Sequence, residues 1–307
     1  MTGDIAVFGS LNMDLVAKVE RFPSPGETIK GKSLAEVPGG KGANQAVAAS
    51  RLGGNVSMFG LLGEDGFGED LLDNLKDYDV DTSFIGKRPG SSGVALIQVD
   101  KGGENQIVII PGANGDVDEA YVDRCLDDLL SSEVLLLQLE IPLETTAYLL
   151  QKLGETKGDK PKVILDPAPA VDLDRLQLSS VDLLTPNEIE LKGISALGDE
   201  EKIISKLFDR GVGSLVVTRG EVGSTIVKRE SRREIPAFSV NPVDTTAAGD
   251  AFVGGLAVAL EEGKSLEAAV RFAGAAGAIS TKGEGAQPSL PGRAKVEELL
   301  KRSSGKG

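Results

Sequence analysis

Residues 39–63 read GGKGANQAVAASRLGGNVSMFGLLG, and this stretch contains the unit from which we expect the fold to be built. Its first half predicts a helix over 42–52, which Gly53 closes. Its second half, Val56 to Leu62, is a short apolar run typical of a buried strand. A helix that leads into a buried strand is part of a βαβ unit, in which helices join parallel strands.

The same alternation continues on both sides of this stretch. Further strands are predicted at 5–9, 134–139, 162–166, 181–185 and 215–218, and further helices at 68–78, 118–130, 143–153, 200–210, 250–261 and 266–279. Repeated βαβ units imply a parallel sheet with helices on both faces. The predicted fold class is therefore α/β, as a single domain over residues 1–307 with a doubly wound, mostly parallel sheet flanked by helices.

Two regions interrupt this rhythm. Gly93 to Asp100 and Asn105 to Pro111 are β-rich runs separated by the sequence KGGE, which is a good hairpin signal. Glu27 to Val37 has partly alternating polarity. These segments predict a small additional β-sheet.

The composition excludes several kinds of catalytic site. The chain has no histidine, so it can form no Ser/His/Asp triad, no Cys/His dyad and no histidine-based zinc site. Its one cysteine, Cys125, excludes an intrachain disulfide and lies on an apolar helical stripe that predicts burial. Acid–base chemistry is left to Asp, Glu, Lys or Tyr.

Charge and hydropathy patterns favour a cytoplasmic protein. The 33 basic and 47 acidic residues give a formal net charge of −14, which disfavours nucleic acid and anionic membranes as partners. Residues 1–10, MTGDIAVFGS, lack the basic start and apolar run of a secretory signal. No apolar run approaches the ~20 residues that a membrane span needs.

Two common nucleotide motifs are poorly supported. Residues 26–33, GETIKGKS, match the phosphate-loop pattern, but nearby prolines leave no buried strand before it and no long helix after it. An exposed strand is the better interpretation. GSLNMD, which follows the first predicted strand, has one glycine only and therefore does not match a dinucleotide-binding loop.

Two helix starts could bind ligands. The sequence GGKGAN at 39–44 allows close backbone approach and offers Lys41 and Asn44 as donors to a sugar or an anion, although a glycine-rich helix start taken alone is more often a plain turn. NPVDTTAAGD at 241–250 precedes a helix with small residues, as in an anion hole of backbone amides. There Asp250 is either a helix cap or a general base, and the Ala-Ala-Gly run favours the base.

Polar residues also follow two predicted strands, where ligands bind in open parallel sheets. TRGEVG at 218–223 follows one strand, and TPNE at 185–188 follows another. Asn187 and Glu190 lie three residues apart, so they could face a metal or phosphate together, or could form a capping box.

Taken in order, eight motifs resemble the ribokinase-like family of carbohydrate kinases over residues 4 to about 302. They are GSLNMD (9–14), GGKGANQAVAASRLG (39–53), QLEIP (138–142), LDPAPA (165–170), TPNEIE (185–190), VTRGEVG (217–223), VDTTAAGDAF (243–252) and GAQPS (285–289). The resemblance implies an ATP-dependent sugar kinase. It also implies that insertions at about 13–38 and 91–112 form a lid over the sugar, through which two subunits pair into a homodimer.

The resemblance also implies roles for individual residues. Asp250 would be the base, next to an anion hole formed by the amides of Ala247, Ala248 and Gly249. The sugar would be bound by Asn12, Met13, Asp14, Gly40, Lys41, Gly42, Ala43, Asn44 and Glu140. ATP would be bound by Asn187, Thr218, Arg219, Gly220, Glu221, Val222, Gly223, Gly249, Asp250 and Gly274. Glu190 would act on Mg²⁺ through water, and K⁺ would be bound by Asp244, Thr246, Ser280, Gly283, Gly285 and Ser289.

The pair Asn12 and Asp14, together with the intact GGKGAN, favours D-ribose as substrate and its 5-hydroxyl as acceptor. Deoxyribose, fructose, a nucleoside such as adenosine, and ketodeoxygluconate are the alternatives within the family. A non-catalytic sugar sensor on the same fold would be expected to lose Asp250 or the anion hole, and both are present.

Overall fold

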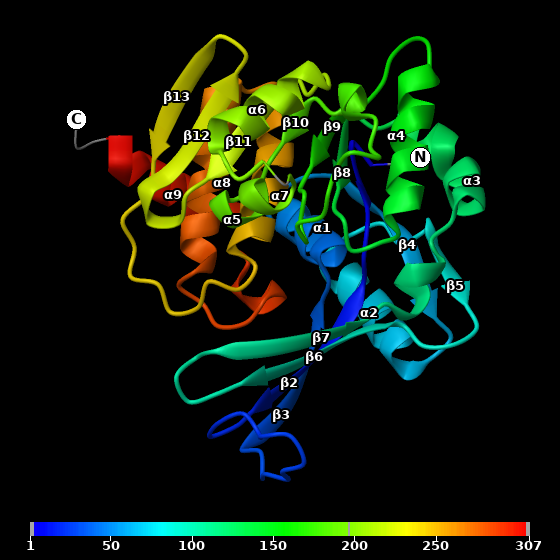
Figure 1. Cartoon of the computed structure of the whole chain (residues 1–307), viewed down its shortest axis with the longest axis vertical. Helices are drawn as coiled ribbons and strands as arrows, with labels where there is room; N and C mark the ends of the chain where they lie inside the picture. Colours follow the sequence, from blue (N-terminus) through cyan, green and yellow to red (C-terminus); the bar gives the residue numbers. More distant parts are fainter. Residues whose placement is uncertain (1–2, 196, 305–307) are drawn as a thin grey trace.

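The structure is a computed structural model that describes residues 3–195 and 197–304. Positions 1–2, 196 and 305–307 of the expected domain therefore lie outside the described residues. The body consists of a large sheet with helices on both faces, and a smaller sheet projects from it (Figure 1). This arrangement confirms the predicted α/β fold with a doubly wound, mostly parallel sheet and an additional small one.

The large sheet has the strand order β13-β12-β11-β10-β9-β8-β1-β4-β5. All neighbours from β11 to β5 pair in parallel, whereas β11–β12 and β12–β13 are antiparallel. The strands are β1 (Ile5–Phe8), β4 (Val56–Gly63), β5 (Ile85–Arg88), β8 (Val134–Leu137), β9 (Lys162–Leu165), β10 (Leu183–Leu184), β11 (Ser214–Thr218), β12 (Gly223–Lys228) and β13 (Ser231–Pro236).

Helices cover both faces of this sheet and create two hydrophobic cores. Successive residues of β1 alternate between them: Ile5 and Val7 belong to one core, and Ala6 and Phe8 to the other. The first core includes residues of α1 (Lys41–Arg51), α2 (Gly66–Asp77), α7 (Ala248–Glu261), α8 (Leu266–Ser280) and α9 (Arg293–Ser304). The second includes residues of α3 (Glu119–Leu130), α4 (Leu143–Glu155), α5 (Glu188–Gly193) and α6 (Glu200–Asp209).

The small sheet has the order β3-β2-β6-β7. Its strands are β2 (Asn12–Lys18), β3 (Ser33–Gly39), β6 (Gly93–Val99) and β7 (Asn105–Ile110). The segment 26–32, which matches the phosphate-loop pattern, leads directly into β3 rather than into a helix. Its largely exposed residues agree with the rejection of a phosphate loop, although the strand begins only at Ser33.

Strand and helix limits differ from the prediction in instructive places. β2, β5 and the β12–β13 hairpin were not predicted, because their sequences are mixed in polarity; β13 is almost wholly exposed. The strand expected at 181–185 is reduced to Leu183–Leu184. Helix α7 begins at Ala248, two residues before its predicted start, so Asp250 lies in the first turn and is not the cap.

Two further findings concern burial and membranes. Cys125 is free and buried on α3, as its apolar stripe predicts. Over residues 3–195 and 197–304, no helix combines the length and apolar character required to cross a membrane.

Candidate active site

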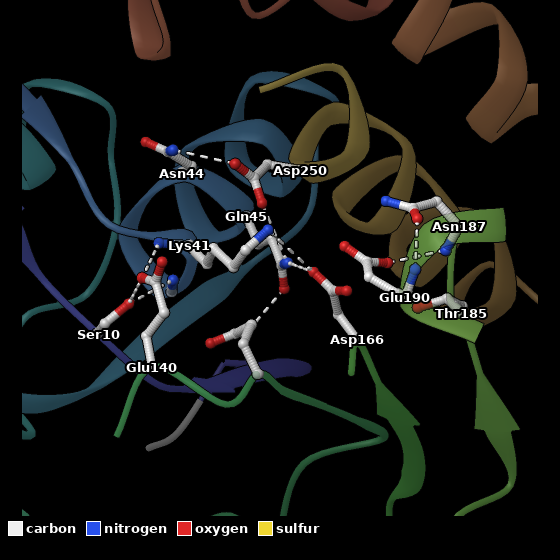
Figure 2. Close-up of polar contacts among 12 residues, drawn as sticks. Ser10, Lys41, Asn44, Gln45, Glu140, Asp166, Thr185, Asn187, Glu190 and Asp250 are labelled. Atoms are coloured by element: carbon white, nitrogen blue, oxygen red, sulfur yellow. Dashed lines mark hydrogen bonds and ion pairs between the residues drawn. The ribbon is translucent and has the colours of Figure 1, made fainter. Parts of the chain in front are cut away.

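The candidate site lies at the carboxyl ends of the parallel strands. β1 pairs with β4 on one side and with β8 on the other, so the chain order reverses at β1. Open α/β sheets bind ligands at such a reversal, because the loops that follow the two neighbouring strands diverge there. Ser10, Glu140 and Asp166 follow β1, β8 and β9, and they point toward the start of α1 (Figure 2).

The start of α1 packs directly against the loop that follows β1. Gly40 precedes the helix with φ 85°, a conformation that favours glycine. A Cβ on Gly40 would lie 2.8 Å from the Asn12 nitrogen, and one on Gly42 would lie 2.6 Å from the Ser10 nitrogen. The GGKG sequence is therefore required for this close contact, which brings the α1 side chains to the strand ends.

Asp250 is held by two amide side chains from α1. Its Oδ2 accepts a hydrogen bond from Asn44 Nδ2 at 3.0 Å, and its Oδ1 accepts one from Gln45 Nε2 at 3.2 Å. Asp250 is 5% exposed. Its side chain does not cap α7, because the cap position is occupied by Ala247, so the interpretation of Asp250 as an N-cap is wrong. Asn44 Oδ1 is buried and has no hydrogen-bond partner among residues 3–195 and 197–304, which leaves an acceptor available for a ligand hydroxyl.

Asn12 and Asp14 lie two residues apart on β2 and so share one face of the small sheet. Asn12 Oδ1 accepts from Asn114 Nδ2 at 2.8 Å, and Asn114 Oδ1 accepts from the Leu11 amide at 2.9 Å. The intervening Met13 points the other way, into the hydrophobic core. Of the predicted sugar residues, Met13 and Ala43 are therefore core side chains, and only their backbone could contact a ligand.

Glu140 is oriented by two donors from the same loop region. Its Oε2 accepts from Ser10 Oγ at 2.6 Å and from the Lys41 amide at 2.9 Å. Burial, followed by the nearby Glu140 and Asp250, raises the pKa of Asp14 to about 7. Asp14, Glu140 and Asp250 therefore form a compact acidic group near the start of α1.

Lys41 is the cation among these acids. Its Nζ lies 3.8 Å from Asp166 Oδ2. Burial lowers the pKa of Lys41, but the carboxylates of Asp166, Asp250, Glu140 and Glu190 outweigh burial and raise it. Lys41 therefore stays protonated. Burial also raises the pKa of Asp166 to about 7, although Lys41 acts against this shift.

The first turn of α7 offers backbone donors beside Asp250. Ala247 adopts a left-handed conformation with φ 58° at the cap position. The Ala248 amide donates to the Thr245 carbonyl at 3.2 Å, but the amides of Gly249 and Asp250 donate to no acceptor within the described residues. Free amides at a helix N-terminus favour an anion. Of the amides predicted for the anion hole, that of Ala248 is thus engaged within the protein and that of Gly249 is free among the described residues, while Asp250 adds a free amide that was not predicted.

Among the residues predicted to bind nucleotide and Mg²⁺, Asn187 and Glu190 form a capping box at the start of α5. Asn187 Oδ1 accepts from the Glu190 amide and Glu190 Oε2 accepts from the Asn187 amide, both at 2.8 Å. The capping-box interpretation is therefore confirmed, and it fixes both side chains. Asn187 also forms a β-bridge with Thr218, so these two predicted ATP residues are neighbours.

The other predicted ATP residues lie on several different elements. Gly220–Val222 form a 3-10 turn after β11, and Gly223 begins β12. Arg219 makes ion pairs with Glu188 and Glu200, so its guanidinium is engaged within the protein. Gly274 lies on α8, where a Cβ would lie 3.8 Å from the ring of Phe238.

The six predicted K⁺ residues lie on neighbouring segments: the stretch before α7, the end of α8 and the turns that follow α8. Asp244 Oδ1 accepts from the Thr246 amide at 2.9 Å, and Asp244 Oδ2 accepts from the Gly285 amide at 2.9 Å. Gly283 donates to the Ser280 carbonyl at 3.1 Å, and a Cβ on Gly283 would lie 3.0 Å from Ser289 Cβ. Burial raises the pKa of Asp244, but hydrogen bonds from Thr246 and Gly285 lower it overall.

The predicted K⁺ residues offer oxygen atoms only, among them backbone carbonyls, and such ligands would suit a hard monovalent cation. Within the described residues there is no group of three or more His, Cys, Asp and Glu side chains that could hold a metal ion. A cation here would therefore depend chiefly on backbone carbonyls, beside a single carboxylate.

Several residues around the site escaped the sequence analysis. They are Ser10, Gln45 and Asn114, which bond to the predicted residues Glu140, Asp250 and Asn12, and Gln138 and Asp166, which bond to Gln45. All except Asn114 lie within the quoted motifs, but the motifs give no indication of which side chains touch. Asn114 lies in the 3-10 helix Gly112–Asp116 after β7, and nothing in its local sequence suggested this contact.

Comparison with known proteins agrees with this geometry. Residues 2–293 match the model of the pfkB family carbohydrate kinases. The chain is 42% identical to a ribokinase of Bacillus subtilis, covering 97% of this chain and 99% of the relative. It is 37% identical to a deoxyribokinase of Salmonella typhimurium, covering 97% and 98%. A structure of Arabidopsis thaliana ribokinase complexed with ribose and ATP superposes with a TM-score of 0.88, at 33% identity and with 98% and 99% coverage.

Proposed function

We propose that this chain, which belongs to the pfkB family of carbohydrate kinases, transfers the γ-phosphoryl group of ATP to the 5-hydroxyl of D-ribose. The observation that carries the proposal is the buried Asp250 carboxylate, fixed by Asn44 and Gln45 beside the free amides of α7. A base next to an anion hole is the arrangement that transfer to an alcohol needs.

In the proposed reaction, the ribose 5-oxygen forms a bond to the γ-phosphorus while the bond from that phosphorus to the β,γ-bridging oxygen breaks. Asp250 takes the hydroxyl proton, and ADP leaves with the electron pair of the broken bond. The amides of Gly249 and Asp250 donate to the oxygens of the transferring group, where negative charge is concentrated. This transfer requires positioning and charge stabilisation, so it does not require a histidine side chain.

The proposed sugar contacts come from three elements. Asn12 and Asp14 of β2 face the ligand from the small sheet, Glu140 from the loop after β8, and Asn44 from α1 through its unpartnered Oδ1. Acceptors predominate, as suits a polyhydroxylated ligand whose hydroxyls donate. The lid proposed for insertions 13–38 and 91–112 would close over this ligand and exclude water.

For the nucleotide side, Asn187 and Thr218 are the proposed contacts near the phosphates, with the turn at 220–223 and Gly274 further along. Glu190 would act on Mg²⁺ through water, since one carboxylate oxygen is used by the capping box and Mg²⁺ usually keeps several waters. Bound Mg²⁺ would supply neutralisation of phosphate charge.

The test is an ADP-release assay with MgATP and K⁺ against ribose, deoxyribose, fructose, adenosine and ketodeoxygluconate. We expect the highest kcat/KM for ribose. Deoxyribose is the second candidate, because the chain is also similar to a named deoxyribokinase. Preference for deoxyribose would replace the substrate while keeping the base and anion hole. No turnover of any sugar would favour the sugar sensor and reject the kinase.

The raised pKa of Asp14 predicts a pH-dependent KM for ribose. With a pKa of about 7, Asp14 is mostly protonated at pH 6 and mostly ionised at pH 8, and only the ionised form accepts freely from sugar hydroxyls. The KM should therefore fall as pH rises, by up to about tenfold per pH unit below 7. Steady-state KM values from pH 5.5 to 8.5 measure it. Asp14→Asn should have a high KM with little pH dependence, and a flat wild-type profile would contradict the assignment.

Removal of K⁺ should slow the enzyme. The proposed K⁺ residue Asp244 is only five residues before Gly249 of the proposed anion hole. Asp244 also accepts a hydrogen bond from the amide of Gly285, another proposed K⁺ residue. A cation bound there would therefore help to hold the segment that carries the anion hole. Exchange of K⁺ for Na⁺ at constant ionic strength should lower kcat roughly tenfold, the equivalent of about 1.4 kcal/mol in the barrier. Tetramethylammonium serves as the inert control. Equal rates in all three salts would remove the K⁺ assignment.

The small sheet supports the proposed homodimer. β7 exposes a continuous apolar run, with Ile107, Val108, Ile109 and Ile110 each between 44% and 60% exposed. An exposed apolar strand is a favourable surface for pairing with another chain. Sedimentation equilibrium at micromolar concentration tests the dimer, and a monomer throughout would reject it.

A further inference from the structure

We propose that Gln45 is a positioning residue that fixes the orientation of the Asp250 carboxylate for proton abstraction. This inference rests on the proposed kinase function. Gln45 is fully buried on α1, and its Nε2 lies 3.2 Å from Asp250 Oδ1 and 2.8 Å from Asp166 Oδ2. Figure 2 shows its amide between the two carboxylates.

The orientation of the Gln45 amide is determined by its partners. Its Oε1 accepts from Gln138 Nε2 at 2.6 Å, on the side away from the carboxylates. A reversed amide would turn its carbonyl oxygen toward two carboxylates and its NH₂ group toward another NH₂ group. Only one orientation therefore satisfies the network, and in that orientation both Nε2 hydrogens are directed at carboxylate oxygens.

Asn44 and Gln45 both bind the Asp250 carboxylate, but they differ in what else they can bind. Asn44 binds Oδ2, and its own Oδ1 is buried without a partner among the described residues, so it can accept from a ligand. Gln45 is completely buried, and its polar atoms are engaged by three protein partners. It therefore has no donor left for a substrate. Its removal should affect the rate of the chemical step rather than substrate affinity.

The donors of Gln45 also separate two buried acids. Asp166 and Asp250 both bind the same Nε2, and only Asp166 has Lys41 within 4 Å. Two carboxylates without a donor between them repel each other. Gln45 directs one hydrogen toward each of them, and its contact with Asp250 Oδ1 fixes the orientation of that carboxylate.

The test is a double-mutant cycle between Gln45→Met, which preserves the length of the side chain, and Asp250→Asn. In the wild-type background, Gln45→Met should lower kcat about tenfold to hundredfold, as expected for a hydrogen bond to a charged group. The KM values for ribose and ATP should change less than about twofold. In the Asp250→Asn background, Gln45→Met should cause no further fall, because it acts through Asp250.

Several results would overturn the proposal. Equal falls of kcat in both backgrounds would mean that Gln45 merely supports the fold, and an unchanged kcat in Gln45→Met would exclude any role. Gln151→Met is the matched control, because Gln151 is exposed on α4 and its side chain bonds only to Glu155 among the described residues. Its kcat should equal that of the wild type.

A second variant keeps the test valid if Gln45→Met does not fold. Gln138→Met removes the donor that orients the Gln45 amide and leaves both carboxylate contacts in place. It should lower kcat by a smaller factor, again only when Asp250 is present, and an unchanged kcat would overturn the proposal. Failure of the kinase function itself is distinguishable, since the wild type would then release no ADP with any sugar. If another sugar is preferred, the cycle is run on that sugar.

Discussion

Asp250→Asn is expected to lower kcat for ribose phosphorylation by at least ~10²-fold, within the range of about 10²–10⁴ typical of a lost general base. The side chain keeps its size, but the new amide cannot accept the proton of the 5-hydroxyl. Binding of ATP should change little, because the phosphate donors at Gly249 are backbone amides. The measurement is kcat by coupled ADP release, together with the Kd for ATP by calorimetry.

The substitution also has a structural cost that must be separated from its chemical effect. Both Asp250 oxygens accept from side-chain amides, of Asn44 and Gln45, so an asparagine places an NH₂ group against one of them. One lost hydrogen bond in a buried site costs about 1–3 kcal/mol of folding free energy. Thermal unfolding of the variant shows whether it remains folded at the assay temperature.

Asp70→Asn provides a control for the change of one charge. Asp70 is exposed on α2 and makes no ion pair or side-chain hydrogen bond with any described residue. Its kcat should match that of the wild type. If folded Asp250→Asn retains more than a tenth of the wild-type kcat, Asp250 is not the base, and the proton must leave by another route.

The parts of the site that could be predicted from the sequence are those in which a local pattern, such as an apolar run or a pair of glycines, permits only one local structure. Short apolar runs with intervening helical periodicity required a parallel sheet, and the strand ends then placed Thr218 and Asn187 at one edge. Gly40 and Gly42 predicted a close backbone approach, which the structure confirms at Asn12 and Ser10. In each case the pattern and its cause lie within a few residues of each other.

What could not be predicted depends on contacts between distant segments. Gln45 and Asp250 are separated by 205 positions, and Leu11 and Asn114 by 103. A polar side chain on a buried helix face has no periodic signal that identifies its partner. The same reason explains β13, whose exposed polar sequence forms a strand only because β12 pairs with it. Whether such a segment forms a strand depends on its pairing partner and not on its local β-propensity.

Gly249→Pro is the second substitution with a large expected effect, and it tests the anion hole separately from the base. The Gly249 amide donates to no acceptor within the described residues, so its loss breaks no hydrogen bond of the fold. Proline is tolerated in the first turn of a helix, where amides have no intrahelical partner. The folded state should therefore survive, as measured by thermal unfolding and circular dichroism.

In the transition state the same amide matters, because Gly249→Pro removes one N–H donor to the negatively charged oxygens of the transferring phosphoryl group. Loss of a single donor of this kind typically lowers kcat about 10²–10³-fold. Gly249→Ala is the matched control: it keeps the amide, and its Cβ meets no atom within 4 Å. We expect near-normal kcat for Gly249→Ala and a kcat about 10²-fold lower for Gly249→Pro. If the two variants turn over equally, the amide of Gly249 does not stabilise the transferring group, and the site must neutralise that charge through other donors.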